Sequence, residues 1–377
     1  MLVQGHARRM GRVALGTLVL GGAGAVMTTG ADAAVFKHKA RHKPHRVVNR
    51  TGAVYVETNE APINQVVVFN RAANGTLSVR QRVPTGGVGA PSPACAMPPR
   101  LPICPIVDSQ GEVNLAANGR VVFAVNAGSN TISSFLETSL GLILIDRKPS
   151  GGIFPISIDS RGNVVYVLNQ LSGNIAGFRF ASNGTMTAIP GSTQSLSTPG
   201  PAGAGAEVRF DPSGRTLTAS ERGTNRIDTF VLGGGGVAGP AIAHPSAAVG
   251  PFGFAFDSRN HLILSNALSQ MAGAATTYGE TPGGGLTPID NKSTSGGAPC
   301  WVVVTPDNRF VYITNTTTKT IARFGLGADG RLTLLGTTPT LNTPMGPILF
   351  PTDEALSRDG RFLYVDIPSV FGGDISR

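Results

Sequence analysis

The stretch Asn118–Phe135, NGRVVFAVNAGSNTISSF, combines a tight turn, a β-branched run that closes on Asn126, a small-polar loop and an Ile-x-x-Phe segment. The same pattern recurs in RGNVVYVLNQLSGNIAGF from Arg161, SGRTLTASERGTNRIDTF from Ser213 and DNRFVYITNTTTKTIARF from Asp307. Weaker copies begin at Val54, Asn260 and Asp359. Such self-similarity indicates a repeat architecture, because one unit cannot bury its apolar face alone.

The residue that closes each β-branched run marks the register of the repeat. These residues are Asn59, Asn126, Asn169, Glu221, Asn266, Asn315 and Asp366, and after a longer first interval they recur every 43–52 residues. Copies of this length, each with about four short strands, predict an all-β, seven-bladed β-propeller over residues 51–377. The 50 glycines and 27 prolines fit its many turns and argue against a helical bundle. A β-sandwich array is the alternative, disfavoured because the copies follow one another without linkers.

The last copy of the repeat is short. Only eleven residues follow Asp366, and they contain no clear Ile-x-x-Phe strand. A propeller closes its ring to remove exposed sheet edges. We therefore expect either a stunted strand from Ser369 to Ile375, or an N-terminal segment near Val47 and Val48, to complete the seventh blade. We predict that this blade is the weakest part of the fold.

Residues 1–50 hold most of the net charge. An arginine-rich start, an apolar Gly-rich run and Ala31-Asp32-Ala33 predict a signal peptide over residues 1–33, with an uncleaved anchor as the alternative. Residues 34–50 are predicted to be a basic, disordered tail, either a spacer or a contact for anionic polymers. Of the formal net charge of +9, these two segments carry +8. The folded domain is nearly neutral, so we expect no nucleic-acid binding by it, and an exported chain in the periplasm or outside the cell.

The cysteines and the missing motifs narrow the chemistry further. Cys95 and Cys104 flank a Pro-rich segment, where an exported protein could form a local disulfide, and Cys300 is expected to be buried. The sequence has no G-x-S-x-G, H-E-x-x-H, zinc-type or Walker-type pattern, so we expect no metal and no cofactor. Asp159, Asp211 and Asp257 stand in D-x-x-G/N-like stretches and are interpreted as turn formers.

Five segments of the chain resemble the seven-bladed lactonase family, which includes 6-phosphogluconolactonase and carboxymuconate cyclase, in its exported bacterial branch with YVTN-type repeats. They are SQGEVNLAANGRVVFAVNAGSNTISSF from Ser109, GGIFPISID from Gly151, ASERGTNRIDTF from Ala219, GPFGFAFD from Gly250 and APCWVVVTPDNRFVYITN from Ala298. The resemblance covers about residues 50–370 and implies a propeller that opens lactones. Family enzymes carry a His-rich stretch before Phe-Asp-Pro, but here residues 200–206 read GPAGAGA. This departure weakens the expectation of catalysis.

Propeller geometry predicts which side chains meet at one mouth of the central channel. Each inner strand starts there, and the second strand of the same blade ends there. The first strands contribute Gln110, Glu207, Arg209 and Trp301, and the second-strand ends contribute Asn126, Asn169, Glu221, Arg222, Asn266 and Asn315. We interpret these residues as the candidate substrate site.

Glu221 stands where the repeat usually has Asn, with Arg222 beside it. In a lactonase, Glu221 would act as a general base on water, and Arg222 or Arg209 would hold an anion and stabilise the oxyanion. The structural alternative is a rim ion pair for Glu221 and Arg222. For the Asn residues the alternative is a cap on the strand-end turn, and for Trp301 it is packing between blades rather than stacking on a ring.

Two functions therefore stand at this stage. The first is hydrolysis of a sugar or muconate-type lactone by a monomeric enzyme. The second is a non-catalytic propeller at the cell surface that binds a carbohydrate or a protein. The position of Glu221 separates the two functions. Hydrolysis requires Glu221 and an arginine to converge on one pocket, whereas non-catalytic binding does not.

Overall fold

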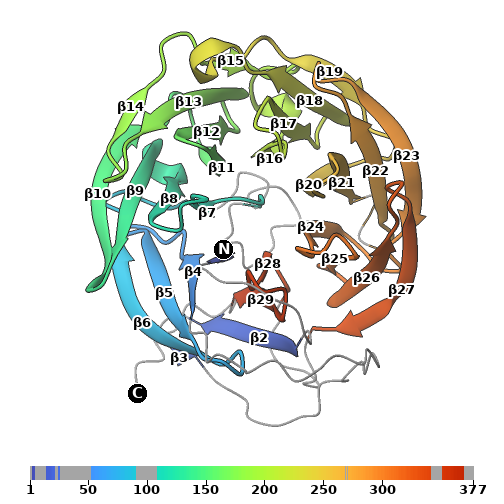
Figure 1. Ribbon diagram of the computed structural model, residues 1–377, viewed down its shortest axis with the longest axis horizontal. Helices are drawn as coiled ribbons and strands as arrows, with labels where there is room; N and C mark the ends of the chain where they lie inside the picture. The colour runs from blue at the N-terminus through green and yellow to red at the C-terminus, as the bar shows by residue number, and fades with distance from the viewer. Residues whose placement is uncertain are drawn as a thin grey trace.

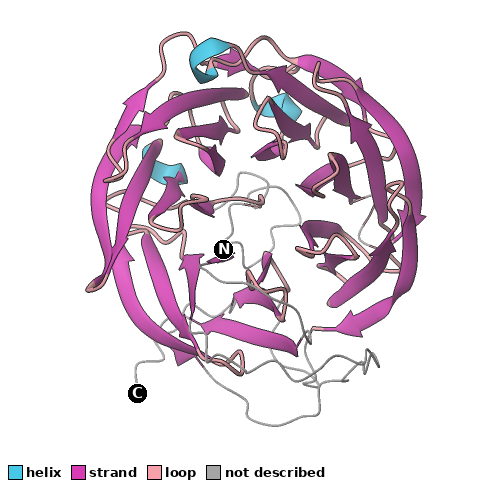
Figure 2. Cartoon of the chain, in the orientation of Figure 1, coloured by secondary structure: helices cyan, strands magenta, loops and turns pink. Residues whose placement is uncertain are grey.

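Seven sheets, in which every described strand pair except one is antiparallel, stand around one axis as the blades of a propeller (Figure 1). The computed structural model describes residues 52–90, 108–267, 269, 271–340 and 350–368, and the backbone of residues 2–4, 14–21 and 24–25. Within these residues the helices are three short 3-10 turns, η2 (Ala127–Ser129), η3 (Pro201–Gly203) and η4 (Gly234–Gly236) (Figure 2). The predicted seven-bladed, all-β fold is confirmed.

Each blade has four strands in order from the axis outward, and the third blade has a fifth. The innermost strands are β1 (Leu2–Gln4), β7 (Val113–Leu115), β11 (Pro155–Arg161), β16 (Gly205–Phe210), β20 (Pro251–Phe256), β24 (Pro299–Val304) and β28 (Glu354–Leu356). The second strands are β4 (Gly52–Glu57), β8 (Val121–Asn126), β12 (Val164–Asn169), β17 (Thr216–Glu221), β21 (His261–Asn266), β25 (Phe310–Asn315) and β29 (Phe362–Pro368).

The outer half of each blade faces its neighbours and solvent. The third strands are β5 (Gln65–Arg71), β9 (Thr131–Thr138), β13 (Asn174–Phe180), β18 (Arg226–Val231), β22 (Ala274–Glu280), β26 (Thr320–Leu326) and β2 (Ala14–Gly21). The outer strands are β6 (Leu77–Pro84), β10 (Gly141–Pro149), β14 (Met186–Ala188), β19 (Ile242–Pro245), β23 (Leu286–Ser293), β27 (Leu332–Pro339) and β3 (Gly24–Ala25), and β15 (Gln194–Ser195) pairs with β13.

The β-branched runs of the repeat form the second strands because these strands are covered on both faces. All six residues of β8 are buried, as are five of the six in β12. A strand sandwiched between two neighbours needs apolar side chains on both faces, so its sequence is a continuous apolar run. The outer strand β6 shows the opposite pattern, with most of its side chains partly or fully exposed.

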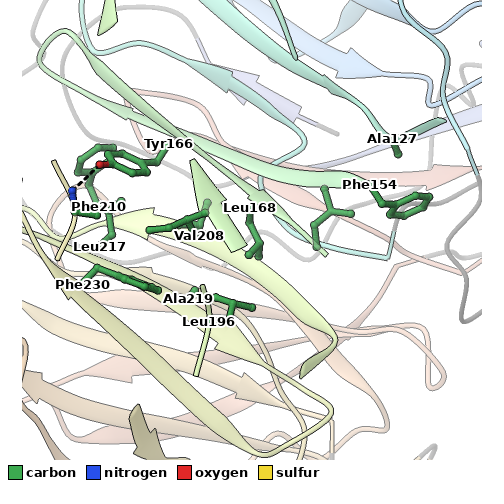
Figure 3. Packing of buried hydrophobic residues seen from close by; sticks show 13 residues of the cluster. Ala127, Phe154, Tyr166, Leu168, Leu196, Val208, Phe210, Leu217, Ala219 and Phe230 are labelled. Atoms are coloured by element: carbon green, nitrogen blue, oxygen red, sulfur yellow. Dashed lines mark hydrogen bonds between the residues drawn. The ribbon is translucent and has the colours of Figure 1, made fainter. Parts of the chain in front are cut away.

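Packing between adjacent blades forms the core. One cluster joins the third and fourth blades through the fully buried side chains of Leu168, Leu217 and Phe230 (Figure 3). Tyr166 packs edge-on against Phe210, with ring centroids 6.0 Å apart. The Tyr166 hydroxyl donates to Gly236 O and accepts from Ala238 N, so its buried oxygen is satisfied.

The ring closes through residues from the N-terminal end of the chain. β2 pairs in parallel with β29, and β1 pairs with β4 and lies between β7 and β28. The expected N-terminal contribution is thus present, but Ala14–Gly21 supplies it. The alternatives near Val47 and in Ser369–Ile375 lie outside the described residues.

The structure corrects the register of the repeat at its two ends. β4 ends at Glu57, which pairs across the blade as the strand-end Asn residues do, so Glu57 and not Asn59 occupies that position. Asn59 lies in the following loop, and its side chain bonds the backbone of Ala90. In β29 the equivalent position is Ile367, one residue after Asp366, because the Phe-Val-Tyr-Ile-Thr-Asn run of β25 aligns with residues 362–367.

The remaining predictions concern turns and cysteines. The Asn-Gly and Asp-Gly pairs at 74–75, 183–184 and 329–330 are hairpin turns with a positive φ at each glycine. Cys300 is buried as predicted, and Cys95 and Cys104 lie outside the described residues. The described part of the chain contains no helix that is long and apolar enough to cross a membrane.

Candidate functional site

Four asparagines at the ends of second strands are buried and cap the turns that follow these strands: Asn126, Asn169, Asn266 and Asn315. Their amide groups bond the loops that enter and leave each blade, with contacts such as Asn169 Nδ2 to Ser150 O and Asn266 Nδ2 to Ala248 O. Asn126 donates to Ser133 and accepts from Thr85, and Asn315 donates to Thr320. All four side chains are fully buried, so these contacts correspond to the cap alternative.

Glu221 takes the same capping place with a carboxylate. Its Oε1 accepts from Thr198 N at 2.9 Å and from Ser197 Oγ at 3.2 Å, and its Oε2 accepts from Thr224 Oγ1 at 2.5 Å. The side chain is fully buried. Glu221 therefore holds the 197–198 loop, and no hydrogen bond or ion pair joins it to Arg222 within the described part of the chain.

The contacts of Glu221 predict a stabilising role. We expect Glu221→Ala to lower the free energy of unfolding by about 1–3 kcal/mol, because Thr198 N and Thr224 lose a buried acceptor. Glu221→Gln keeps one acceptor oxygen and should cost clearly less. Urea denaturation of both variants measures this. If both variants lost the same free energy of unfolding, the hydrogen bonds of Glu221 would not be the source of its stabilising effect. If Glu221→Gln abolished lactone hydrolysis, Glu221 would again be the candidate general base.

Arg222, the residue that follows the end of β17, is paired with a partner that the sequence did not predict. Its Nη1 lies 2.7 Å from Asp108 Oδ2, and its guanidinium stacks 5.4 Å from the centre of the Phe252 ring. Phe252 packs edge-on against Trp301, which is buried and donates from Nε1 to Ser109 O. Trp301 is therefore used for packing and for this hydrogen bond.

A second group of side chains meets at the centre of the ring and is called here the central cluster. Its members lie on innermost strands, or directly before them, in the second, third, fourth and seventh blades: Glu112, Asp159, Glu207, Arg209 and Asp353. Arg209 donates from Nε to Glu207 Oε1 at 2.8 Å and feels the charges of Asp159 and Asp353. The sequence predicted Arg209 and Glu207 for this site.

Glu207 and Arg209 form an ion pair of unequal exposure. The Glu207 side chain is fully buried, whereas 34% of the Arg209 side chain is exposed. Burial raises the pKa of Glu207 to about 8, although Arg209 and the hydrogen bond from Phe254 N act in the opposite direction. Arg209 thus keeps part of its side chain exposed on an innermost strand, while Glu207 fixes the direction of its guanidinium.

Asp159 is a member of the cluster that the sequence interpretation missed. The D-x-x-G pattern predicted a turn former, but β11 continues to Arg161 and places Asp159 on the strand beside Arg209. Its oxygens accept from Asn114 Nδ2 at 2.8 Å and from Phe210 N at 2.9 Å. Burial raises its pKa, and Arg209 and these hydrogen bonds limit the rise. Asp211 and Asp257 do cap turns as predicted.

Glu112 is the second missed carboxyl group. Burial raises its pKa well above the ordinary value, and the neighbouring Asp353 and Glu57 act in the same direction. Ser109 Oγ lies 2.7 Å from both Glu112 Oε1 and Ile156 O. One hydroxyl proton serves one of these acceptors, so a protonated Glu112 that donates to Ser109 satisfies all three groups. Residues 112–115 and 207–210 share the pattern Glu-Val-x-x, and this similarity to the predicted residue Glu207 could have identified Glu112 from the sequence.

The carboxyl groups of Asp159 and Glu112 differ in how strongly their pKa values are raised, and acid–base catalysis by two carboxyl groups needs such a difference. Burial raises the pKa of both groups, but the rise is limited at Asp159 by Arg209 and by several hydrogen-bond donors, whereas the pKa of Glu112 is raised well above its ordinary value. Carboxyl groups whose pKa values are pushed apart can serve as base and acid in one site. No group of three or more His, Cys, Asp or Glu side chains within the described ranges is arranged to hold a metal ion.

Comparison with known proteins agrees with this architecture. Residues 45–195 match the sequence model of the family described as lactonase, 7-bladed β-propeller. The predicted resemblance to the lactonase family is confirmed. No curated protein matches the chain.

Several solved structures share the fold of this lactonase-like chain. A Bacteroides uniformis protein, provisionally named a 6-phosphogluconolactonase, is 19% identical with a TM-score of 0.61 over 83% of this chain and 88% of its own. The periplasmic gluconolactonase of Pseudomonas aeruginosa is 15% identical with a TM-score of 0.59 over 76% and 82%. A Lactobacillus plantarum protein is 16% identical with a TM-score of 0.61 over 77% and 82%. At these identities the likeness concerns the fold.

Proposed function

We propose that this lactonase-like propeller hydrolyses a sugar lactone at the central cluster. The observation that carries the proposal is the partly exposed side chain of Arg209, on which the charges of Asp159 and Asp353 act, together with Glu112, which lies close enough to Asp353 for their charges to interact. A cationic donor and two carboxyl groups of different pKa are what ester hydrolysis needs. The names of the Bacteroides and Pseudomonas relatives point to the same substrate class.

The proposed reaction uses one residue for each task. Asp159, as carboxylate, removes a proton from water while the water oxygen bonds the lactone carbonyl carbon. Arg209 stabilises the resulting oxyanion through its N–H groups. The ring carbon–oxygen bond then breaks, and Glu112 gives its proton to the leaving alkoxide to yield a hydroxy acid. Solvent returns the proton from Asp159 to Glu112. This assignment moves the general base from Glu221 to Asp159.

The charge of the central cluster predicts an uncharged substrate. Arg209 is its only cationic member and is already paired with Glu207, and the charges of Asp159 and Asp353 also act on it. A phosphorylated or carboxylated lactone would bring further negative charge close to these groups, which Coulomb repulsion disfavours. We therefore favour a neutral sugar lactone over a phosphogluconolactone or a muconate-type lactone.

The test compares hydrolysis of glucono-1,5-lactone and its 6-phosphate by the purified protein. We expect the neutral lactone to be opened faster than its spontaneous hydrolysis, with kcat/KM at least about tenfold above that of the phosphate, and Asp159→Asn to lower kcat by about 10²-fold or more. Asp290→Asn, on outer strand β23, is the matched control. Wild-type rates equal to the spontaneous rate would reject the function, and preference for the phosphate would reject the charge argument.

A binding propeller without catalysis is the second candidate. The stretch GPAGAGA replaces the His-rich stretch expected of family enzymes, and Ala206 lies buried beside Trp301. If neither lactone is hydrolysed but glucono-1,5-lactam, a stable lactone analogue, binds in calorimetry and loses affinity in Arg209→Gln, this second function replaces the first.

We also propose that the protein is exported, on the strength of its arginine-led, Ala-x-Ala-terminated N-terminus. The name of the Pseudomonas relative, a periplasmic gluconolactonase, points the same way. Cleavage after Ala33 would remove the residues of β1, β2 and β3, so the ring of the mature chain would need replacement strands from elsewhere.

A further inference from the structure

The segment Asp108–Gly111 runs from the second blade across the centre of the ring to the inner strands of four other blades (Figure 1). Ser109 Oγ donates to Ile156 O on β11, and Gln110 N donates to Ala206 O on β16. Gln110 Nε2 reaches Val302 O on β24 at 2.9 Å. This segment ties together strands that no sheet connects.

The far side of the ring is built to receive Gln110. Its side-chain amide pairs with the backbone of Val302 in both directions, since Oε1 accepts from Val302 N at 3.0 Å while Nε2 donates to Val302 O. Only 3% of Gln110 is exposed. At Gly253 a Cβ atom would lie 2.2 Å from Gln110 Oε1, so only glycine permits this close approach. Gln110 is therefore a structural tie and has no polar group left for a substrate.

An ion pair fixes the other end of the segment. Asp108 Oδ2 lies 2.7 Å from Arg222 Nη1, and Phe252 supports the guanidinium from below. Ser109 O accepts from Trp301 Nε1 at 2.7 Å. The carboxylate of Asp108 occupies Arg222 as the anionic group of a ligand would.

We infer that residues 108–111 form a strap that closes this face of the ring, and that the Asp108–Arg222 ion pair is its latch. The strap is bound to the buried cluster of Ala206, Phe252, Cys300 and Trp301 through hydrogen bonds from Trp301 Nε1 to Ser109 O and from Gln110 N to Ala206 O. An anion can take the place of Asp108 at Arg222 Nη1 only when the latch opens. The inference is independent of the proposed hydrolysis.

Cys300 is a built-in reporter of the strap. Its thiol is buried, with 8% of the residue exposed, and donates to Ala298 O. Burial raises its pKa to about 12, and the charges of Asp108 and Arg222 both act on it, which places the thiol beside the latch. A thiol reagent should therefore react with Cys300 chiefly after the strap has opened.

The experiment measures the reaction of Cys300 with 5,5′-dithiobis(2-nitrobenzoic acid) in the full chain with Cys95 and Cys104 replaced by serine. We expect Asp108→Asn and Arg222→Gln each to raise the rate by about tenfold, and the double variant to exceed neither by more than about twofold, because each change breaks the same latch.

Glu137→Gln is the matched control. The Arg80–Glu137 pair is 2.6 Å long with side chains 29% and 21% exposed, close to the 28% and 19% of Arg222 and Asp108, but it lies on outer strands. It should leave the rate within about twofold of the parent protein. Unchanged rates in both latch variants would overturn the inference, as would rates that rise with urea as global unfolding does. If Arg222→Gln does not fold, Asp108→Asn alone decides.

Discussion

Arg209→Gln should lower kcat for glucono-1,5-lactone by about 10²–10³-fold, which is the loss seen when one preorganised oxyanion donor is removed. The reason is geometric, because Glu207 Oε1 holds the guanidinium by two contacts of 2.8 Å while a third of the side chain faces the central space. Arg209→Lys should recover only part of the rate, since a lysine cannot keep both contacts and still donate to the substrate.

Three further expected results distinguish a loss of catalysis in Arg209→Gln from a loss of the folded structure. Burial already raises the pKa of Glu207 to about 8, so without Arg209 its carboxyl group stays protonated and the fold should survive. Added guanidinium chloride at low millimolar concentration should restore part of the rate of Arg209→Gln. Arg80→Gln, which also removes an arginine from a carboxylate pair, should keep full activity. A normal rate in Arg209→Gln would remove Arg209 from the proposed reaction.

The repeat made most of the fold predictable. Six-residue β-branched runs form the second strands because every one of them is sandwiched between neighbouring blades. The errors came at the chain ends, where the pattern is weakest. Asn59 resembled the other closing asparagines, but the strand ends two residues earlier at Glu57. The partner strand of β29 comes from residues 14–21, whose composition indicated an export signal.

The candidate site was less predictable because its residues do not share one repeat position. Arg209 and Glu207 were proposed because propeller geometry places first-strand residues at the central channel, and both lie on innermost strand β16. Asp159 was missed because its D-x-x-G pattern suits a turn as well as a strand end. Asp108 belongs to an insertion without any repeat, so its contact with Arg222, 114 residues away, follows from the tertiary structure alone.

A second large effect is expected from the buried carboxyl pair of Asp228 and Glu221. Asp228 Oδ2 accepts from Ser197 N at 2.6 Å, whereas Oδ1 has no donor unless one of the two carboxyl groups carries a proton. Burial, with Glu221 adding to it, raises the pKa of Asp228 to about 7. The hydrogen bonds from Thr224 and Thr198 outweigh burial and lower the pKa of Glu221. The shared proton therefore resides on Asp228.

The sign of the pH dependence follows from this. A carboxyl group whose pKa is higher in the folded than in the unfolded chain binds an extra proton on folding, so its contribution to stability is full below about pH 4 and is lost as the pH rises through about 7. Glu280, with a pKa raised by burial to about 7, acts in the same direction. Wild-type stability should fall between pH 5 and 8.

Asp228→Asn should remove part of that fall, because an amide does not ionise and its N–H₂ group can donate to Glu221 permanently. The variant should gain about 2 kcal/mol relative to wild type between pH 5 and 8, roughly half of what a full three-unit shift would give. Urea denaturation at pH 5, 6, 7 and 8 measures the difference. Asp290→Asn is the control, since hydrogen bonds from Leu332 N and Asn291 N outweigh its slight burial and lower the pKa of Asp290, which stays ionised throughout this range. Parallel pH profiles for wild type and Asp228→Asn would show that the pair does not hold the proton.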